Sequence, residues 1–241
     1  MNHHNYGDVG DIILEKKELI AENLLEFHDE IHDIKGRRLL RIMEMDNDEE
    51  ALLIKGYLHR CDYSASSDSR VEYVNDFLLE KLDGMMKRWK ATNLNKAEPV
   101  EWNLLQHFCK EHSEDNLIIT AQTGMGKTEA GLLWLGNHKG FFVLPIRTAI
   151  NAIYERIRSN IINQENVGER LALLHSDTLS YYASKDNVDQ LSPLEYRLRS
   201  RQLSLPITVT TLDQIFDFVF KYSGFEMKLA TLSYSKLIID E

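Results

Sequence analysis

The segment at residues 117–130, LIITAQTGMGKTEA, constrains this chain more than any other part of its sequence. It begins with an apolar run at residues 117–119, which predicts a short buried strand of a parallel sheet. The glycine-rich sequence TGMGKT follows directly, and residues 129–135 have the composition of a helix. A strand, a glycine-rich turn and a helix in this order are typical of a phosphate-binding loop, because the turn and the helix N-terminus both direct backbone amides at an anion.

Two side chains of this loop are expected to contact a bound nucleotide. Lys127 is placed to reach the β- and γ-phosphate oxygens, and the hydroxyl of Thr128 is placed to bind Mg²⁺. The strict motif begins with glycine, whereas this chain has Ala121, which resembles the Ala-x-x-Gly-x-Gly-Lys-Thr form usual in helicase-like ATPases. The alternative, a glycine turn that merely enters a helix, has no need of Lys-Thr at this spacing. The predicted nucleotide-binding residues are Ala121, Gln122, Thr123, Gly124, Met125, Gly126, Lys127 and Thr128.

A second motif stands at residues 236–241, where an apolar run ends in Asp240 and Glu241. An acid pair at the carboxyl end of a buried strand suits the Mg²⁺-assisted hydrolysis of a nucleoside triphosphate. Asp240 is expected to hold Mg²⁺ through water, and Glu241 is expected to polarise the attacking water. The sequence Ile-Ile-Asp-Glu alone is weak evidence. Together with the loop upstream, it predicts an ATP site whose catalytic residues are Lys127, Asp240 and Glu241.

Composition limits the class of protein. The 241 residues allow one large or two modest domains, and a hydrophobic content of 43% is ordinary for a globular protein. No run approaches the ~20 apolar residues of a membrane span, so we expect no membrane segment and a cytoplasmic location. The net charge of −10 argues against nonspecific coating of nucleic acid, but it allows a narrow basic groove. Cys61 and Cys109 lack metal-type spacing and are expected to be reduced thiols.

The distribution of apolar residues divides the chain into two parts. Residues 14–90 have helical periodicity, and the polar, proline-containing residues 91–99 are the expected linker. From residue 100 onward, short apolar runs alternate with helical segments, which predicts an α/β domain whose parallel sheet is covered on both faces. Besides residues 117–119, the expected strands are residues 140–145, 171–174, 207–210 and 236–240, and the expected helices are residues 101–110, 129–135, 148–160 and 212–221.

With both ATP motifs in place, the chain resembles superfamily 2 DNA helicases, and specifically the combined helicase and HD-type metal nuclease of type I CRISPR systems. VLPIRTAINAIYERI at residues 143–157 resembles motif Ia of that family, and VTTLDQIFDF at residues 209–218 resembles its motif Ib. The resemblance implies that these segments contact the backbone of single-stranded DNA. The matching positions are Arg147, Thr148, Thr210 and Thr211. A surface ion pair is the alternative role of Arg147, and His175 in the intervening segment LLHSDTLSYY is expected to be structural.

The N-terminal part resembles the metal nuclease domain of the same family. HHNYGDVGDI at residues 3–12 is similar to a histidine pair followed by a glycine loop, and GYLHRCDYSAS at residues 56–66 is similar to the last motif of that domain. The resemblance implies that His3, His4 and Asp62 ligate a divalent transition metal, whose identity the sequence does not give. An exposed tail for the histidines and a surface acid for Asp62 are the alternatives.

The resemblance also implies a domain plan. A partial, all-α HD-type domain is expected at residues 1–90, a linker at residues 91–99, and an incomplete first RecA-like helicase lobe at residues 100–241. ATP and Mg²⁺ are the implied cofactors, and the implied partners are single-stranded DNA and a Cascade-type CRISPR surveillance complex. Because members of that family are several-fold longer, we expect a fragment that binds ATP weakly and neither unwinds nor cuts DNA alone, and whose missing lobes a separate chain can supply. Another superfamily 2 remodeller with an unrelated helical domain, and a non-catalytic nucleotide- or partner-binding module, are the alternatives.

Overall fold

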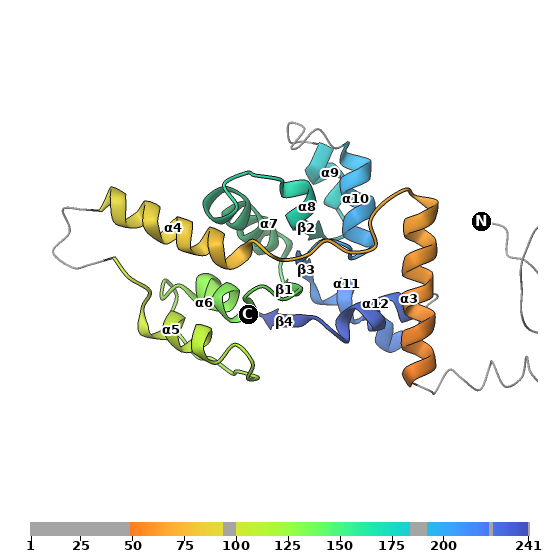
Figure 1. The fold of residues 1–241 in the computed structure, drawn as a ribbon, viewed down its shortest axis with the longest axis horizontal. Coiled ribbons are helices and arrows are strands. Elements are labelled where there is room, and N and C mark those ends of the chain that lie inside the picture. Colours follow the sequence, from red (N-terminus) through yellow and green to blue (C-terminus); the bar gives the residue numbers. More distant parts are fainter. Residues whose placement is uncertain (1–48, 94–99, 184–191, 222–223, 241) are drawn as a thin grey trace, which may run out of the picture. The chain divides into compact units, whose positions relative to one another are not determined.

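The computed structural model (Figure 1) describes residues 49–93, 100–183, 192–221 and 224–240. Contacts divide the chain into two units, Met1–Asp46 and Asn47–Glu241, and all of the described residues belong to the second unit. Within these residues, no helix combines the length and the apolar character needed to cross a membrane.

Four parallel strands form the sheet of this unit, in the spatial order β2-β3-β1-β4. Phe142 at the centre of β1 lies opposite Val209 of β3 on one side and opposite Ile238 of β4 on the other. The strands are β1 (Gly140–Leu144), β2 (Leu171–Leu174), β3 (Ile207–Thr211) and β4 (Lys236–Ile239). The four predicted strands downstream of the glycine-rich loop are therefore confirmed, with ends that differ by at most one residue.

Helices cover both faces of the sheet (Figure 1). They are α3 (Glu49–Ser66), α4 (Leu78–Thr92), α5 (Leu104–Glu111), α6 (Lys127–Leu135), α7 (Arg147–Arg156), α8 (Val167–Arg170), α9 (Thr178–Ala183), α10 (Pro193–Arg201), α11 (Leu212–Phe216) and α12 (Phe225–Leu232). A π-helical turn, η2 (Ile157–Ile161), continues α7, and a 3-10 turn, η3 (Asp217–Phe220), continues α11. The helices predicted after residue 100 are confirmed as α5, α6, α7 with η2, and α11 with η3.

The larger apolar cluster lies on one face of the sheet, under α4, α6 and α7. Phe142 and Val209 of the sheet share this cluster with Leu82 of α4, Leu132 of α6 and Ile150 of α7, and all five side chains are buried. Burying an apolar side chain of this size stabilises a fold by about 1.5–3 kcal/mol. The cluster therefore holds α6, and the loop from which α6 begins, firmly against β1.

The alternate side chains of the same strands face the opposite layer. Phe141 and Val143 of β1 pack with Ile215 of α11 in a second buried cluster, to which Leu232 of α12 and Leu237 of β4 contribute. Adjacent residues of a strand point to opposite faces of a sheet, so this alternation gives β1 two apolar faces. The sheet is consequently the middle layer of three, as predicted for a parallel α/β domain.

The helices α3 and α4 belong to the same compact unit as the sheet. Leu82 of α4 lies in the main core, and α3 packs so closely on α12 that a Cβ atom on Gly56 would overlap the carbonyl oxygen of Glu226. The predicted domain boundary at residues 91–99 thus separates segments that pack together, because the apolar face of α4 is buried by the sheet layer. Residues 1–48, including the predicted helix from residue 14, lie outside the described part of the chain.

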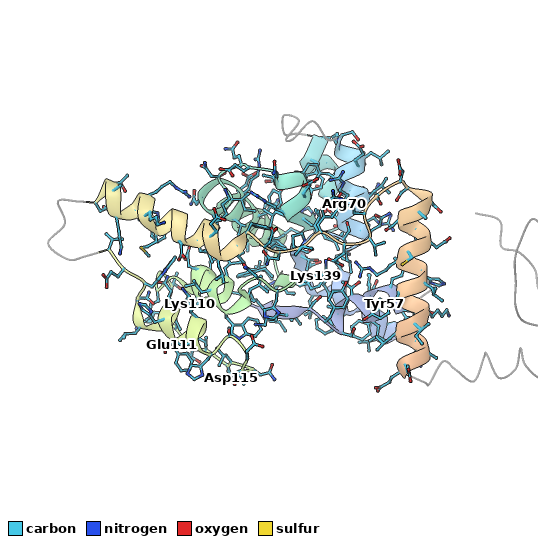
Figure 2. The ribbon with its side chains drawn as sticks, in the orientation of Figure 1. Tyr57, Arg70, Lys110, Glu111, Asp115 and Lys139 are labelled. Carbon is cyan, nitrogen blue, oxygen red and sulfur yellow. The ribbon has the colours of Figure 1, made fainter. Side chains whose placement is uncertain are left out.

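A cluster of charged groups, in which Arg60 and Lys139 are buried and Glu72 is half-buried, joins α3 to the start of β1. The carboxylate of Glu72 lies 2.5 Å from Nζ of Lys139 and 2.6 Å from Nη2 of Arg60, and it accepts a hydrogen bond from the hydroxyl of Tyr234 at 2.7 Å. Lys139 also donates to the carbonyl oxygen of Leu205 at 2.8 Å. Figure 2 shows Lys139 in the interior of the unit. Burial lowers the pKa of Lys139 to about 8, and Glu72 opposes part of this decrease.

The strand predicted at residues 117–119 is not formed. These residues have no assigned strand structure, and Ile118 is fully exposed. A strand needs backbone hydrogen bonds to a neighbouring strand, and residues 117–119 make none to β4, the edge strand of the described sheet. A cavity of about 150 Å³ is instead lined by Leu117 and Ile119 on one side and by residues of β4 on the other. The prediction was wrong because an apolar run specifies burial but not the presence of a pairing partner.

Candidate nucleotide site

The glycine-rich loop enters α6 with a backbone shape that glycine adopts most readily. Gly124 has a φ of 87° and Gly126 a φ of 77°, both in the left-handed region. The amide of Met125 donates to the carbonyl oxygen of Gln122 at 3.3 Å, which closes a turn. Within the described part of the chain, no hydrogen bond uses the amides of Gly124, Gly126 or Lys127. These donors at the N-terminus of α6 are therefore available to an anion.

Two side chains that begin α5 hold the loop in this shape. Asn103 Nδ2 donates to the carbonyl oxygen of Met125 at 2.9 Å, and Gln106 Nε2 donates to that of Gly126 at 3.4 Å. Asn103 and Gln106 also form a capping box, in which each side chain accepts a hydrogen bond from the other's backbone amide. Sequence reasoning did not assign either residue to the site. The Asn-x-x-Gln spacing predicts a helix start, but it gives no sign of the contact with the loop.

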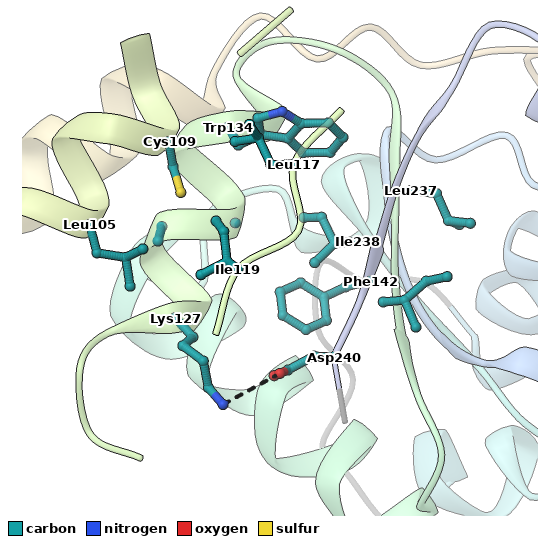
Figure 3. A pocket seen from close by; sticks show the side chains of 13 residues that line it. Leu105, Cys109, Leu117, Ile119, Lys127, Trp134, Phe142, Leu237, Ile238 and Asp240 are labelled. Atoms are coloured by element: carbon teal, nitrogen blue, oxygen red, sulfur yellow. Dashed lines mark ion pairs between the residues drawn. The ribbon is translucent and has the colours of Figure 1, made fainter. Parts of the chain in front are cut away.

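The ammonium group of Lys127 and the carboxylate of Asp240 face each other across the site (Figure 3). Their Nζ and Oδ1 atoms are 3.9 Å apart, and both side chains are partly exposed. This separation exceeds hydrogen-bond length, so the two groups attract each other without being bound together. A phosphate and a metal ion can consequently take up these two charges without first breaking a hydrogen bond between them.

Parallel pairing explains why these distant residues meet. The strand β4 lies beside β1, and the amide of Asp240 donates to the carbonyl oxygen of Val143 at 3.0 Å. The helix α6 packs on the same sheet, so its first residue, Lys127, comes to the carboxyl ends of both strands. This edge is where parallel α/β sheets bind ligands.

The groups gathered here fit a nucleoside triphosphate with Mg²⁺. The free loop amides and the Lys127 ammonium are donors for phosphate oxygens. Thr128 follows Lys127 as the second residue of α6, and its hydroxyl together with the Asp240 carboxylate supplies oxygen ligands of the kind Mg²⁺ prefers. When bound, Mg²⁺ would neutralise charge on the phosphates, while this chain's residues position them. Glu241, the second predicted acid, lies outside the described residues.

An ion pair between a buried carboxylate and a half-exposed guanidinium adjoins the loop and was not anticipated from the sequence. Glu129, next to Thr128 in α6, is only 1% exposed, and its Oε1 atom lies 2.6 Å from Nη2 of Arg156. Arg156 is the last residue of α7. No motif or spacing connects the two positions, since the pair exists only because α6 and α7 pack on the same face of the sheet.

The residues predicted to contact DNA differ in their accessibility. Arg147 and Thr148 are exposed at the N-terminus of α7, and Arg147 Nη1 donates to the hydroxyl of Ser176 at 3.3 Å, with no ion pair to any residue that the structure describes. Thr210 is fully buried, and its hydroxyl donates to the backbone carbonyl of Thr211, which is also buried. The side chain of Thr210 therefore does not reach the surface, because it lies on an inner face of the central strand β3.

His175 is held as a neutral structural residue, as expected. Its Nδ1 atom accepts a hydrogen bond from the amide of Asp177 at 3.1 Å, and its Nε2 atom lies 3.0 Å from Oδ1 of Asn151. Burial lowers the pKa of His175, which favours the neutral ring that this pattern requires. The ring links α7 to the turn that follows β2.

The described residues contain only one of the predicted nuclease ligands. Asp62 is exposed on α3, and no group of three or more His, Cys, Asp or Glu side chains suited to a metal occurs in the part of the chain that the structure describes. His3 and His4 lie outside that part. Cys61 and Cys109 are free thiols, as expected. The donor set seen around Asp62 thus does not by itself fit a transition metal.

The parallel sheet, the glycine-rich loop and the facing acid define a RecA-like α/β helicase domain. The chain belongs to the DEAD/DEAH box helicase family, whose sequence model matches residues 99–241, more than half of its length.

The chain is also similar to two curated proteins. The chain is 26% identical over 230 residues to the CRISPR-associated nuclease/helicase Cas3 of Methanothermobacter thermautotrophicus, an alignment that covers 94% of this chain and 26% of the relative. It is 29% identical over 167 residues to the putative CRISPR-associated nuclease/helicase Cas3 of Methanocaldococcus jannaschii, covering 61% of this chain and 22% of that relative. The chain thus spans about a quarter of the length of the relatives that it matches.

Proposed function

We propose that this chain binds ATP with Mg²⁺ through its glycine-rich loop and Asp240, as the ATP-binding lobe of a helicase. The observation that carries the proposal is the 3.9 Å approach of Lys127 Nζ to Asp240 Oδ1 at the end of a loop with free amides. Lys127 orients the terminal phosphates, the loop amides hold the anion, and Asp240 with Thr128 places Mg²⁺. Glu241 polarises the attacking water.

A titration with a fluorescent ATP analogue in the presence of Mg²⁺ tests this proposal. Lys127→Ala removes the cation that contacts the phosphates, a charge-assisted contact worth about 1.5–3 kcal/mol, so affinity should fall by about 10- to 100-fold. The matched control is Lys110→Ala, which removes a lysine at the end of the neighbouring helix α5. Equal affinity of wild type and Lys127→Ala for the analogue would contradict the proposed nucleotide site.

The nucleic-acid partner in this proposal is single-stranded DNA. Arg147 and Thr148 are exposed at the carboxyl edge of the sheet, on the same edge as Asp240, where they can contact successive phosphates without reading bases. The names of the curated relatives favour a CRISPR system, with a Cascade-type surveillance complex as partner, over another superfamily 2 remodeller. Fluorescence anisotropy with a labelled oligonucleotide tests the DNA contact.

The N-terminal segment is proposed to belong to an HD-type metal nuclease. His3, His4 and Asp62 are the candidate ligands, and the support is that the alignment with the first relative covers 94% of this chain. Calorimetric titration with Mn²⁺ before and after Asp62→Ala tests the assignment, and identical titrations would leave Asp62 as a surface acid. We propose that this chain alone hydrolyses ATP weakly and does not unwind DNA, because helicases of this class use a second lobe that carries an arginine finger, worth about 10³–10⁵ in rate.

A further inference from the structure

Glu129 places a buried negative charge directly against the phosphate-binding loop. Its side chain is 2% exposed, and its Oε2 atom lies 3.6 Å from the position that a Cβ atom would occupy on Gly126. Gly126 is the N-cap of α6, so the carboxylate sits within the first turn of the helix that is directed at the anion. Among the described residues, Arg156 is the cation that pairs with it, at 2.6 Å.

An uncompensated carboxylate at this place would oppose nucleotide binding. The N-terminus of a helix carries roughly half a positive charge, and a nearby carboxylate cancels much of it. The repulsion between such a carboxylate and a triphosphate is also strong in a partly buried site, where the effective dielectric constant is well below that of water. The guanidinium of Arg156, whose side chain is 42% exposed, offsets this repulsion at close range, and the pair joins α6 to the end of α7.

We propose that Arg156 is a positioning residue of the nucleotide site, which acts by neutralising the buried Glu129 carboxylate beside the phosphate-binding loop. The inference rests on the proposed ATP site and assigns a role to a residue that touches neither nucleotide nor metal. Arg158, two positions further along the chain, does not share this role, because it forms an ion pair with Glu155 at 3.2 Å.

The test is the affinity for fluorescent ATP and ADP analogues with Mg²⁺, measured for a set of folded variants. Arg156→Met should lower the affinity for the ATP analogue by about tenfold or more, the change expected from losing a charge-assisted pair. It should lower the affinity for the ADP analogue less. Arg156→Lys keeps the charge and should stay close to wild type. The Glu129→Gln/Arg156→Met double variant carries no buried charge and should recover most of the lost affinity, and Arg158→Met is the matched control.

Several results would overturn the inference. Wild-type affinity in Arg156→Met would show that the Glu129 charge does not affect nucleotide binding at the loop. Equal losses of affinity in the single and double variants, or equal losses of affinity for both analogues, would show that Arg156 has a structural role alone. Should Arg156→Met fail to fold, Arg156→Gln removes the charge but keeps a hydrogen-bond donor, and it provides the same comparison. If wild type binds neither analogue, the proposed nucleotide site itself fails, which is a separate outcome.

Discussion

Lys127 and Asp240 stand near opposite ends of the segment that matches the helicase family, yet Nζ of one lies 3.9 Å from Oδ1 of the other. The sheet order brings them together, because β4 pairs with β1 and α6 packs across both strands. The loop before Lys127 is fixed independently by Asn103 and Gln106 of α5. Protein contacts alone thus position the loop and the two charged side chains, and these charges are not locked to each other by a hydrogen bond.

The contact between Gln106 and the loop makes Gly126 less replaceable than Gly124. Both glycines have left-handed φ values, but a Cβ atom on Gly126 would overlap Gln106 Nε2, whereas one on Gly124 would meet nothing within 4 Å. Gly124→Ala should lower the free energy of unfolding by about 1 kcal/mol through backbone strain alone. Gly126→Ala should lower it by about 0.5–1.5 kcal/mol more, because the end of the Gln106 side chain must move and give up a hydrogen bond. Urea unfolding of the ligand-free protein measures both, and equal losses would mean that the overlap is relieved without effect.

The close packing of α3 on α12 predicts opposite effects for two helical glycines. Gly56→Ala would place a methyl group against the carbonyl oxygen of Glu226 and the side chain of Ala230, so the unfolding free energy should fall by about 1–3 kcal/mol. Gly84→Ala, inside α4, meets only the flexible end of Arg88 at 3.6 Å and should raise it by up to about 1 kcal/mol. Thermal or urea unfolding measures the change in stability of both variants. A stabilising effect of Gly56→Ala would show that α3 does not pack on α12.

Burial of Lys139 predicts a pH-dependent stability. Its pKa is about 8 in the folded protein and 10.5 when exposed, so between these values the unfolded chain binds more protons. Stability therefore rises with pH in this window, as the penalty for burying the ammonium beside Glu72 and Arg60 is lifted. Between pH 8 and 10, wild type should gain about 2 kcal/mol relative to Lys139→Met. Parallel pH curves for the two proteins would contradict the assignment.

The accessibility of the candidate DNA contacts predicts that they are not equivalent. Arg147 is exposed, so Arg147→Ala should weaken the binding of single-stranded DNA of any sequence. It should also reduce the slope of log affinity against log salt concentration by about 1. Thr210 is fully buried, and the isosteric Thr210→Val should leave binding unchanged. Anisotropy titrations at several salt concentrations measure both effects. A loss with Thr210→Val and none with Arg147→Ala would reverse the assignment.

The fold was predictable from sequence wherever one segment carries its own signal. The strands β1 to β4 follow from short apolar runs, and the loop follows from its glycines and from Lys127. The prediction of a strand at residues 117–119 was wrong because an apolar run does not determine whether a segment pairs, and this one is separated from the edge strand β4 by a cavity. Glu129 with Arg156, and Lys139 with Glu72, could not be foreseen, since each pair is created by tertiary packing between elements whose spacing in the chain is arbitrary.

The central claim is that Lys127 and Asp240 act on the same nucleotide and its metal. Its most direct test is calorimetric ATP affinity with and without Mg²⁺, for wild type and Asp240→Asn, which keeps the side-chain shape but removes the charge. We expect Mg²⁺ to strengthen ATP binding by wild type and this gain in affinity to shrink by about tenfold in Asp240→Asn, because a charged contact is lost. The same Mg²⁺-dependent gain in both proteins would contradict it.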